Sequence, residues 1–90
     1  MALQKKIELS NGITLENAYV RVDAVMGSKF GMSFNVDTYM SETAYKNKKG
    51  YMERKAYSFV PSVDEDSKNF IAQAYNYLKT LDEFSDAKDV

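Results

Sequence analysis

Two consecutive runs of alternating apolar and polar residues occupy the middle of the chain. In the first run, one face carries Ala18, Val20, Val22, Ala24 and Met26. In the second run, one face carries Phe30, Met32, Phe34, Val36, Thr38 and Met40. A period of two with a single apolar face is typical of half-buried strands. The runs therefore predict two antiparallel strands joined by a short turn.

The register of this central hairpin follows from the parity of its apolar positions. A shift of the pairing register by one residue would expose all apolar side chains of a strand to water. A three-residue turn at 27–29 places Met26 opposite Phe30 and Val22 opposite Phe34, whereas a two-residue turn at 27–28 sets apolar residues against polar ones. We therefore predict a turn of odd length.

A second hairpin is predicted at the N-terminus, where residues 3–9 alternate in the same way. An Asn-Gly pair often forms a two-residue loop, but here that loop would separate the apolar residues of the two strands. A three-residue loop at 10–12, with Gly12 in the left-handed conformation, pairs Leu9 with Ile13 and Lys6 with Glu16. Burial and charge both favour the longer loop.

The apolar parity changes between Leu15 and Ala18. One extra residue at 16–17 reconciles the two sets, as a β-bulge does, and the chain then bends at this point. Two separate short strands would explain the same change. We keep both interpretations as hypotheses.

The second half of the chain shows a loop, a strand and a helix. Residues 41–50 are polar, and Lys46, Lys48 and Lys49 are typical of a solvated hairpin end, with a phosphate-binding tip as the alternative. Residues 51–60 resume strand character and end at Pro61, with the inward face left open. Ser62 and Glu65 match a helix capping box.

A helix is accordingly predicted over 63–81. Its apolar stripe contains Phe70, Ile71, Ala74, Leu78 and Leu81, with Tyr75 and Tyr77 on the flanks. Residues 82–90 are acidic and weakly patterned, so we expect a fraying tail unless Phe84 docks. The predicted fold is a single α+β domain over 1–90, with strands at about 3–9, 13–26, 30–40 and 51–60. These strands form a small antiparallel sheet, and the C-terminal helix packs on it.

Composition narrows the function. The 90 residues include no Cys and no His, and the net charge is −1. Disulfides, thiol catalysis and the commonest general base are therefore excluded, and no global field favours nucleic acid. No apolar run approaches a membrane span or a signal peptide. We expect a protein made in a cytoplasm, with no membrane partner.

No constellation of residues indicates catalysis. Asp64, Glu65 and Asp66 are the densest carboxylates, and a helix cap explains them, although a divalent-metal site with Asp64 and Asp66 is an alternative. Glycines are scattered, without a phosphate-cradling loop. We therefore predict a protein that is not an enzyme and that has no catalytic, cofactor or metal site.

Aromatic residues make up 13% of the chain, and seven are Tyr. A small core uses such residues, but Tyr is also enriched at protein interfaces. The predicted interface is the outer sheet face with its adjoining loop, namely Tyr19, Arg21, Tyr39 and Tyr45. Asp23 and Asp37 on that face would repel a phosphate backbone, which makes nucleic acid an unfavoured partner.

Three stretches carry a resemblance to a known group of proteins. They are NGITLENAYVRV (Asn11–Val22), YSFVP (Tyr57–Pro61) and AYNYLKTL (Ala74–Leu81). This order resembles small tail- and baseplate-region proteins of siphovirus-type tailed phages of Bacillus and related Gram-positive bacteria. It is also similar to the shoulder-type domain of lactococcal phage receptor-binding proteins.

The resemblance implies a non-enzymatic structural or tail-assembly protein that acts through protein–protein contacts. The implied partners are other tail or baseplate proteins, or further copies of the chain. The implied location is the host bacterial cytoplasm during assembly and then the virion tail. The alternative hypothesis is a phage-encoded cytoplasmic modulator that binds a host protein or nucleic acid.

Overall fold

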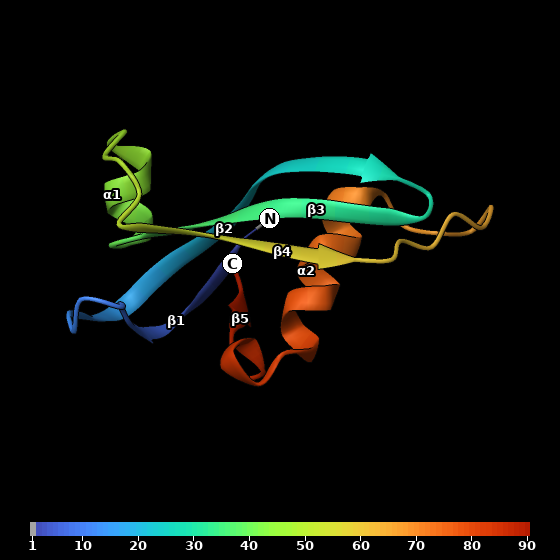
Figure 1. Cartoon of the computed structure of the whole chain (residues 1–90). Helices are drawn as coiled ribbons and strands as arrows, with labels where there is room; N and C mark the ends of the chain where they lie inside the picture. The colour runs from blue at the N-terminus through green and yellow to red at the C-terminus, as the bar shows by residue number, and fades with distance from the viewer. Residues whose placement is uncertain (1) are drawn as a thin grey trace.

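A computed structural model describes residues 2–90 and shows one antiparallel sheet with helices beside it (Figure 1). The strands are β1 (Leu3–Glu8), β2 (Thr14–Ser28), β3 (Gly31–Tyr39), β4 (Glu53–Phe59) and β5 (Lys88–Asp89). The helices are α1 (Glu42–Lys46), α2 (Phe70–Thr80) and the 3-10 turn η1 (Asp82–Phe84). The strand order is β4-β3-β2-β1-β5, so β4 is an edge strand. The predicted α+β class is confirmed, with a fifth strand added.

The N-terminal hairpin has the predicted loop. The N–H of Leu9 donates to the carbonyl of Ile13 at 2.7 Å, and Gly12 has a φ of +90°. Lys6 and Glu16 form the expected cross-strand ion pair at 3.9 Å. A glycine is needed in this loop because L side chains rarely adopt a positive φ.

Of the two hypotheses for residues 16–17, the β-bulge is confirmed. Ile7 pairs with Leu15 and Lys5 pairs with Ala18, so two residues of β2 face one residue of β1. β2 continues without a break, which rules out two separate strands. As a result, the side chains of Leu15 and Ala18 both join the buried cluster around Leu9.

The central hairpin differs from the prediction. Its turn is the two-residue Lys29-Phe30, because Ser28 pairs with Gly31. A second bulge between Val22 and Val25 changes the parity, so that Val25 packs on the core. The predicted inward positions Met26 and Phe30 are therefore exposed, Phe30 by 79%.

The close approach of two backbones explains this turn. A Cβ atom on Gly27 would lie 2.3 Å from the carbonyl oxygen of Gly31, and the φ of Gly27 is +139°. Only glycine fits both conditions. The bulge and the even-length turn together return the apolar residues of β2 and β3 to one face.

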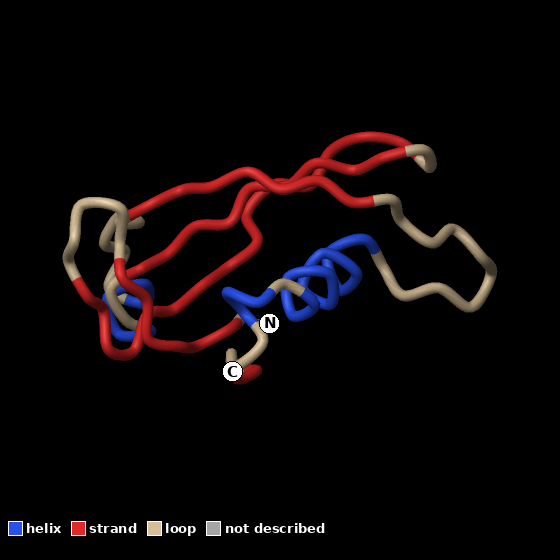
Figure 2. Tube along the Cα trace, turned by 60° about the horizontal axis from the view of Figure 1, so that its bottom comes forward, coloured by secondary structure: helices blue, strands red, loops and turns tan. Residues whose placement is uncertain are grey.

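The concave face of the sheet carries the core. Phe34, Tyr57, Phe59 and Tyr77 make ring contacts there, which settles the inward face of β4 as that of Tyr57 and Phe59. Figure 2 shows the sheet curving over α2. Among helices in residues 2–90, none has the length and apolar composition to cross a lipid bilayer.

α2 begins later than predicted, at Phe70, because Asn69 is its N-cap and accepts from the N–H of Ala72 at 2.8 Å. Ser62 does not cap it. Instead, the side chain of Gln73 donates to the carbonyls of Ser62 and Lys68 and accepts from the N–H of Ser62. Residues 62–68 are thus a loop fastened to the helix.

The buried face of α2 also differs from the predicted stripe. Ala74 and Leu78 are buried as expected, but Phe70 and Ile71 are exposed. Tyr75 lies at the centre of the core, where its hydroxyl accepts from the N–H of Val22 at 2.9 Å.

The C-terminal segment is folded rather than frayed. Phe84 is 6% exposed and belongs to the main core, and β5 pairs with Leu3 and Gln4 of β1. Lys5 holds the same segment through an ion pair with Asp86 at 3.0 Å. Phe84 therefore docks in the core, and the expected fraying of residues 82–90 does not occur.

Candidate protein interface at the α1 end

A short helix that the sequence pattern does not reveal stands at one end of the sheet. α1 occupies part of the segment predicted as a loop at 41–50. The hydroxyl of Ser41 caps it by accepting from the N–H of Ala44 at 3.1 Å. Lys46 and Glu42 form an i,i+4 ion pair at 2.8 Å. The helix is held against β2 and β3, and it brings Tyr45 over the outer sheet face.

Three of the four predicted interface residues gather around the fourth, Tyr45. Its ring centroid lies 5.3 Å from that of Tyr19 and 4.9 Å from that of Tyr39, and the guanidinium carbon of Arg21 lies 4.4 Å from it. Tyr19 is only 9% exposed because the other members cover it. Tyr39, Tyr45 and Arg21 keep partial exposure. The cluster is therefore a packed base with an accessible rim.

A hollow of about 390 Å³ lies at this rim, lined by Tyr39, Tyr45, Lys46, Lys48 and Lys49. The chain folds back after α1, with the N–H groups of Lys48 and Lys49 donating to the carbonyls of Tyr45 and Ala44. Lys48 takes a positive φ of +61° in this turn. The turn thus places three ammonium groups beside two phenol rings.

The charge state of the hollow is fixed at neutral pH. Burial raises the pKa of Tyr39, and the nearby carboxylate of Asp37 raises it further, so the phenol stays neutral. The hydrogen bond from Lys46 to Glu42 raises the pKa of the lysine. The surface is consequently aromatic and cationic, which suits an anionic partner with apolar groups.

Asp37 behaves differently from the sequence-based expectation. It is 1% exposed, and Arg54 holds it with two hydrogen bonds, Nε to Oδ1 at 2.6 Å and Nη2 to Oδ2 at 2.8 Å. Arg54 also contacts Asp23 at 3.2 Å and stacks on Tyr51. The hydrogen bond to Asp37 raises the pKa of Arg54. Asp37 is therefore neutralised and does not repel anions from this face.

Arg54 is the residue of this site that sequence reasoning missed. A signal for it exists, because Asp37 pairs with Arg54 across β3 and β4, and opposite charges are favourable at such positions. Reading that signal requires the register between these strands, which the sequence pattern left open.

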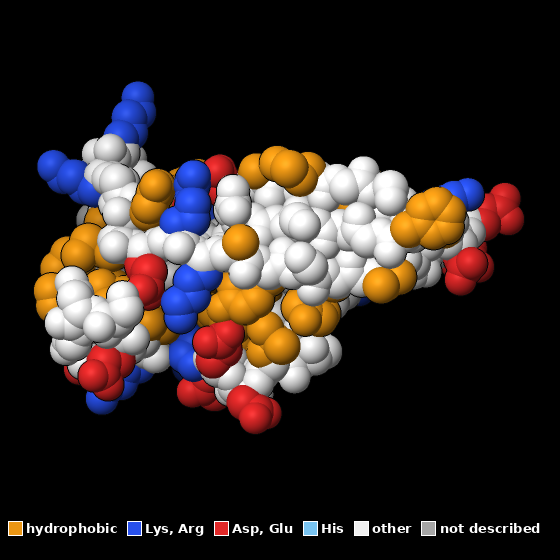
Figure 3. Space-filling view, in the orientation of Figure 1, with side chains coloured by type: hydrophobic (Ala, Val, Ile, Leu, Met, Phe, Trp, Pro, Cys, Tyr) orange, Lys and Arg blue, Asp and Glu red, His pale blue; other side chains and the backbone are white. Residues whose placement is uncertain are grey.

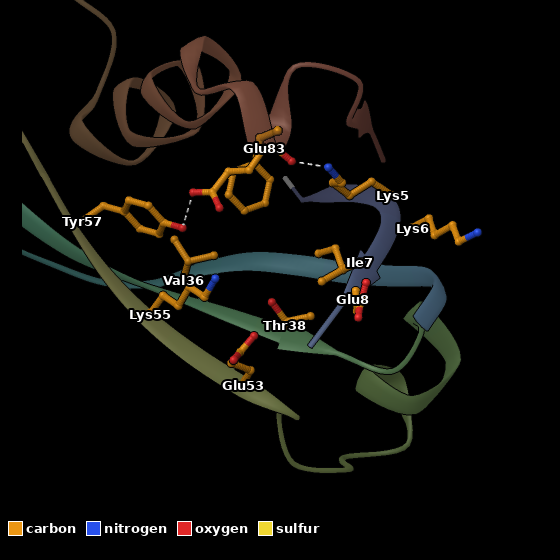
Figure 4. A pocket seen from close by; sticks show the side chains of 11 residues that line it. Lys5, Lys6, Ile7, Glu8, Val36, Thr38, Glu53, Lys55, Tyr57 and Glu83 are labelled. Carbon is orange, nitrogen blue, oxygen red and sulfur yellow. Dashed lines mark hydrogen bonds between the residues drawn. The ribbon is translucent and has the colours of Figure 1, made fainter. Parts of the chain in front are cut away.

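A second hollow, of about 180 Å³, lies on the concave face beyond the end of α2 (Figure 4). Several of its polar groups are engaged within the chain. Tyr57 donates to Glu83 at 2.7 Å, Ser10 donates to Glu53 at 2.7 Å, and Lys5 donates to the carbonyl of Glu83. We therefore take the α1 end as the candidate site, because two of the lysines that line its hollow, Lys48 and Lys49, form no side-chain ion pair within residues 2–90.

Residues 2–90 contain no group of three or more acidic, His or Cys side chains arranged to hold a metal ion. Comparison of the chain with protein-family models, curated proteins and solved structures finds no match. Function must therefore be inferred from the geometry of the candidate interface.

Proposed function

We propose that the chain is a non-enzymatic binding module that contacts other proteins through the hollow at the α1 end. The observation that carries this proposal is the pairing of partly exposed Tyr39 and Tyr45 with three lysines around one concavity. Tyr supplies contact area at protein interfaces, while charged groups at the rim select the partner. The exposed side chains of Met40, Tyr51 and Met52 flank the same helix and add apolar area.

The biological setting of the proposal comes from the sequence resemblance alone. A structural or tail-assembly protein of a siphovirus-type phage would use such a hollow to dock on a neighbouring tail or baseplate protein. The residues proposed to make the contact are Tyr39, Tyr45 and the adjoining lysines, with Tyr19 and Arg21 holding Tyr45 in place.

Site-specific photo-crosslinking tests the proposal. A benzophenone amino acid replaces Lys49 at the hollow and, as a matched control, exposed Asn76 on α2. The chain is produced in infected cells, and both purified particles and cell extracts are irradiated. We expect protein adducts from position 49 that are absent from position 76. Adducts from position 76 alone would overturn the proposal.

A second function is favoured by the same chemistry. Two Tyr rings beside lysines also suit a base and its phosphates, and the neutralisation of Asp37 removes one source of repulsion. A cytoplasmic modulator that binds nucleic acid would show strong, salt-dependent binding to single-stranded oligonucleotides by fluorescence anisotropy. Nucleic-acid adducts at position 49, without protein adducts, would favour this alternative.

A further inference from the structure

The two ends of the elongated molecule carry opposite charges. We call residues 40–52 the lysine end, where three lysines and one glutamate give a net charge of +2. We call residues 60–70 the acidic end, where Asp64, Glu65 and Asp66 with one lysine give −2. The molecule measures 40 × 27 × 21 Å. Figure 3 shows blue side chains projecting at one end of its long axis and red side chains at the tip of the other, with further charged side chains of both signs between them.

Exposed apolar side chains accompany the charges at both ends. Val60, Val63 and Phe70 are exposed at the acidic end, as Met40, Tyr51 and Met52 are at the lysine end. Such a mixture is typical of binding surfaces, in which apolar contact stabilises the complex and charge fixes its orientation. Each end thus has the composition of one half of an interface.

The acidic end is shaped to project. Residues 62–68 extend past the sheet and α2 (Figure 1), and Gln73 fastens both ends of this loop through its hydrogen bonds to Ser62 and Lys68. A further bond joins the N–H of Ser67 to the carbonyl of Asp64 at 3.0 Å. A loop ordered in this way loses little conformational entropy when it binds.

We infer that the acidic end of one copy docks in the tyrosine–lysine hollow of a second copy. This inference rests on the proposed function and names its partner. A concave surface lined by lysines and tyrosines is complementary to an anionic, partly apolar segment that protrudes. Residues 60–70 of the same chain have all three properties. Charge complementarity between the +2 and −2 ends supports this occupant. Residues 82–90 are also acidic, but Phe84 packs in the core and β5 pairs with β1, so that segment does not project as residues 62–68 do.

The geometry determines the form of the assembly. The two ends lie at opposite extremes of one molecule, so no copy fills its own hollow. Contacts between different surfaces are heterologous, and they build a closed ring or an open filament instead of a two-fold dimer.

Charge exchange between the ends tests the inference on the full-length chain. One variant carries Asp64→Lys and Asp66→Lys, and the other carries Lys48→Glu and Lys49→Glu, which leaves the Lys46–Glu42 pair intact. Sedimentation velocity follows mass across a concentration series at low salt and at about 0.5 M NaCl, where the Debye length is only a few ångströms. Circular dichroism confirms that each variant is folded.

We expect the wild-type chain to gain mass with concentration and to lose that gain at high salt. Each variant alone should associate at least ~10-fold more weakly, because like charges then meet at the interface. An equimolar mixture of the two variants, and a chain with all four substitutions, should recover association. The control Glu8→Lys with Asp82→Lys changes two exposed positions outside residues 40–52 and 60–70, has the charge change of the first variant and should associate like the wild type.

A wild-type chain that stays monomeric at all concentrations would overturn the inference. So would undiminished association of either variant, failure of the mixture to recover, or equal weakening by the control. None of these results decides the proposed function, which is tested by the photo-crosslinking experiment. A cross-link from position 49 to a different protein supports it, and no protein adduct there counts against it.

Discussion

At the scale of single residues, two buried polar groups organise the molecule. Asp37 lies on the outer side of the sheet and is neutralised by Arg54, while Tyr75 lies on the core side and satisfies the N–H of Val22. Each places a polar atom where water cannot reach it, so each depends on its partner. Breaking either hydrogen-bonded pair should therefore lower the free energy of unfolding measurably.

Arg54→Met should lower the free energy of unfolding by about 2 kcal/mol, because it leaves the Asp37 carboxylate buried without its counter-ion. This loss is smaller than for a fully buried ion pair because the Arg54 side chain is 39% exposed and solvent screens its charge. Urea unfolding at pH 7 measures the change. The double variant Asp37→Leu with Arg54→Met should lose less than the single variant. An equal or greater loss would show that Asp37 is not paired as described.

Because of Tyr75 in the core, we expect the stability of the fold to decrease at alkaline pH. Burial raises the pKa of the Tyr75 hydroxyl, so the folded state retains this proton more firmly than the unfolded chain does. The resulting stability is fully present below the ordinary tyrosine pKa of about 10 and is lost as pH rises through the raised value.

Tyr75→Phe should therefore lower stability by about 1–2 kcal/mol at pH 7, because the N–H of Val22 loses its acceptor, yet flatten the decline above pH 10. Thermal unfolding at a series of pH values measures both effects. Tyr51→Phe, at an exposed position, is the control and should change neither. A parallel decline in Tyr75→Phe and wild type would contradict the prediction.

At the scale of elements, bulges decide which residues of β2 face the core. The strand has 15 residues, and its inward positions switch parity at 16–17 and again between Val22 and Val25. Each switch adds a residue and twists the strand, which curves the sheet around α2. The hairpin end can form only because Gly27 allows β2 and β3 to approach closely.

Gly27→Ala should destabilise the chain by at least ~2 kcal/mol, since the new Cβ would clash with the Gly31 carbonyl at an already unfavourable φ. Gly31→Ala is the matched control, because a Cβ there meets nothing within 4 Å. Chemical denaturation of both variants measures the difference. Similar losses in the two would show that the close approach does not exist.

The first bulge was predictable and the second was not, for a physical reason. Between Leu15 and Ala18 only one parity carries apolar residues at a time, so the switch is visible. Between Val22 and Met26 apolar residues occupy both parities, and burial cannot choose between them. The hairpin register was therefore wrong, although the strands themselves were predicted.

Local helix rules failed where tertiary contacts competed with them. Ser62 and Glu65 satisfy a capping pattern, but Gln73 binds the backbone of Ser62 and holds 62–68 as a loop. α1 is too short for periodicity to reveal. For the candidate site, strand parity placed Tyr19, Arg21 and Tyr39 on one face. The position of Tyr45 could not be predicted without knowledge of α1, and the role of Arg54 could not be predicted without the register of β4.

At the scale of the whole molecule, the C-terminal segment completes the concave side. Phe84 fills the core next to Tyr57, and β5 lies beside β1, so the last residues join the two ends of the chain in one sheet. Lys5 adds an ion pair whose hydrogen bond lowers the pKa of Asp86. The segment therefore belongs to the fold and is not an appendage.

Phe84→Ala should cost about 3 kcal/mol of stability, as removal of a buried ring usually does. Hydrogen exchange should also show faster exchange in β5 and in the paired part of β1, because the segment loses its anchor. Asp82 in the same segment is exposed, so Asp82→Asn should change neither the stability nor the hydrogen exchange. Unaltered protection of β5 in Phe84→Ala would contradict the anchoring role.

The exposed edge of β4 sets a limit on how copies of the chain stack. Glu53, Arg54 and Lys55 begin this strand, so its first half places charged side chains along the open hydrogen-bonding edge. Charges on an edge strand discourage sideways strand addition, the route by which sheets merge into amyloid. These charges should disfavour cross-β aggregation of the protein, even at the high local concentration that copies reach in an end-to-end assembly.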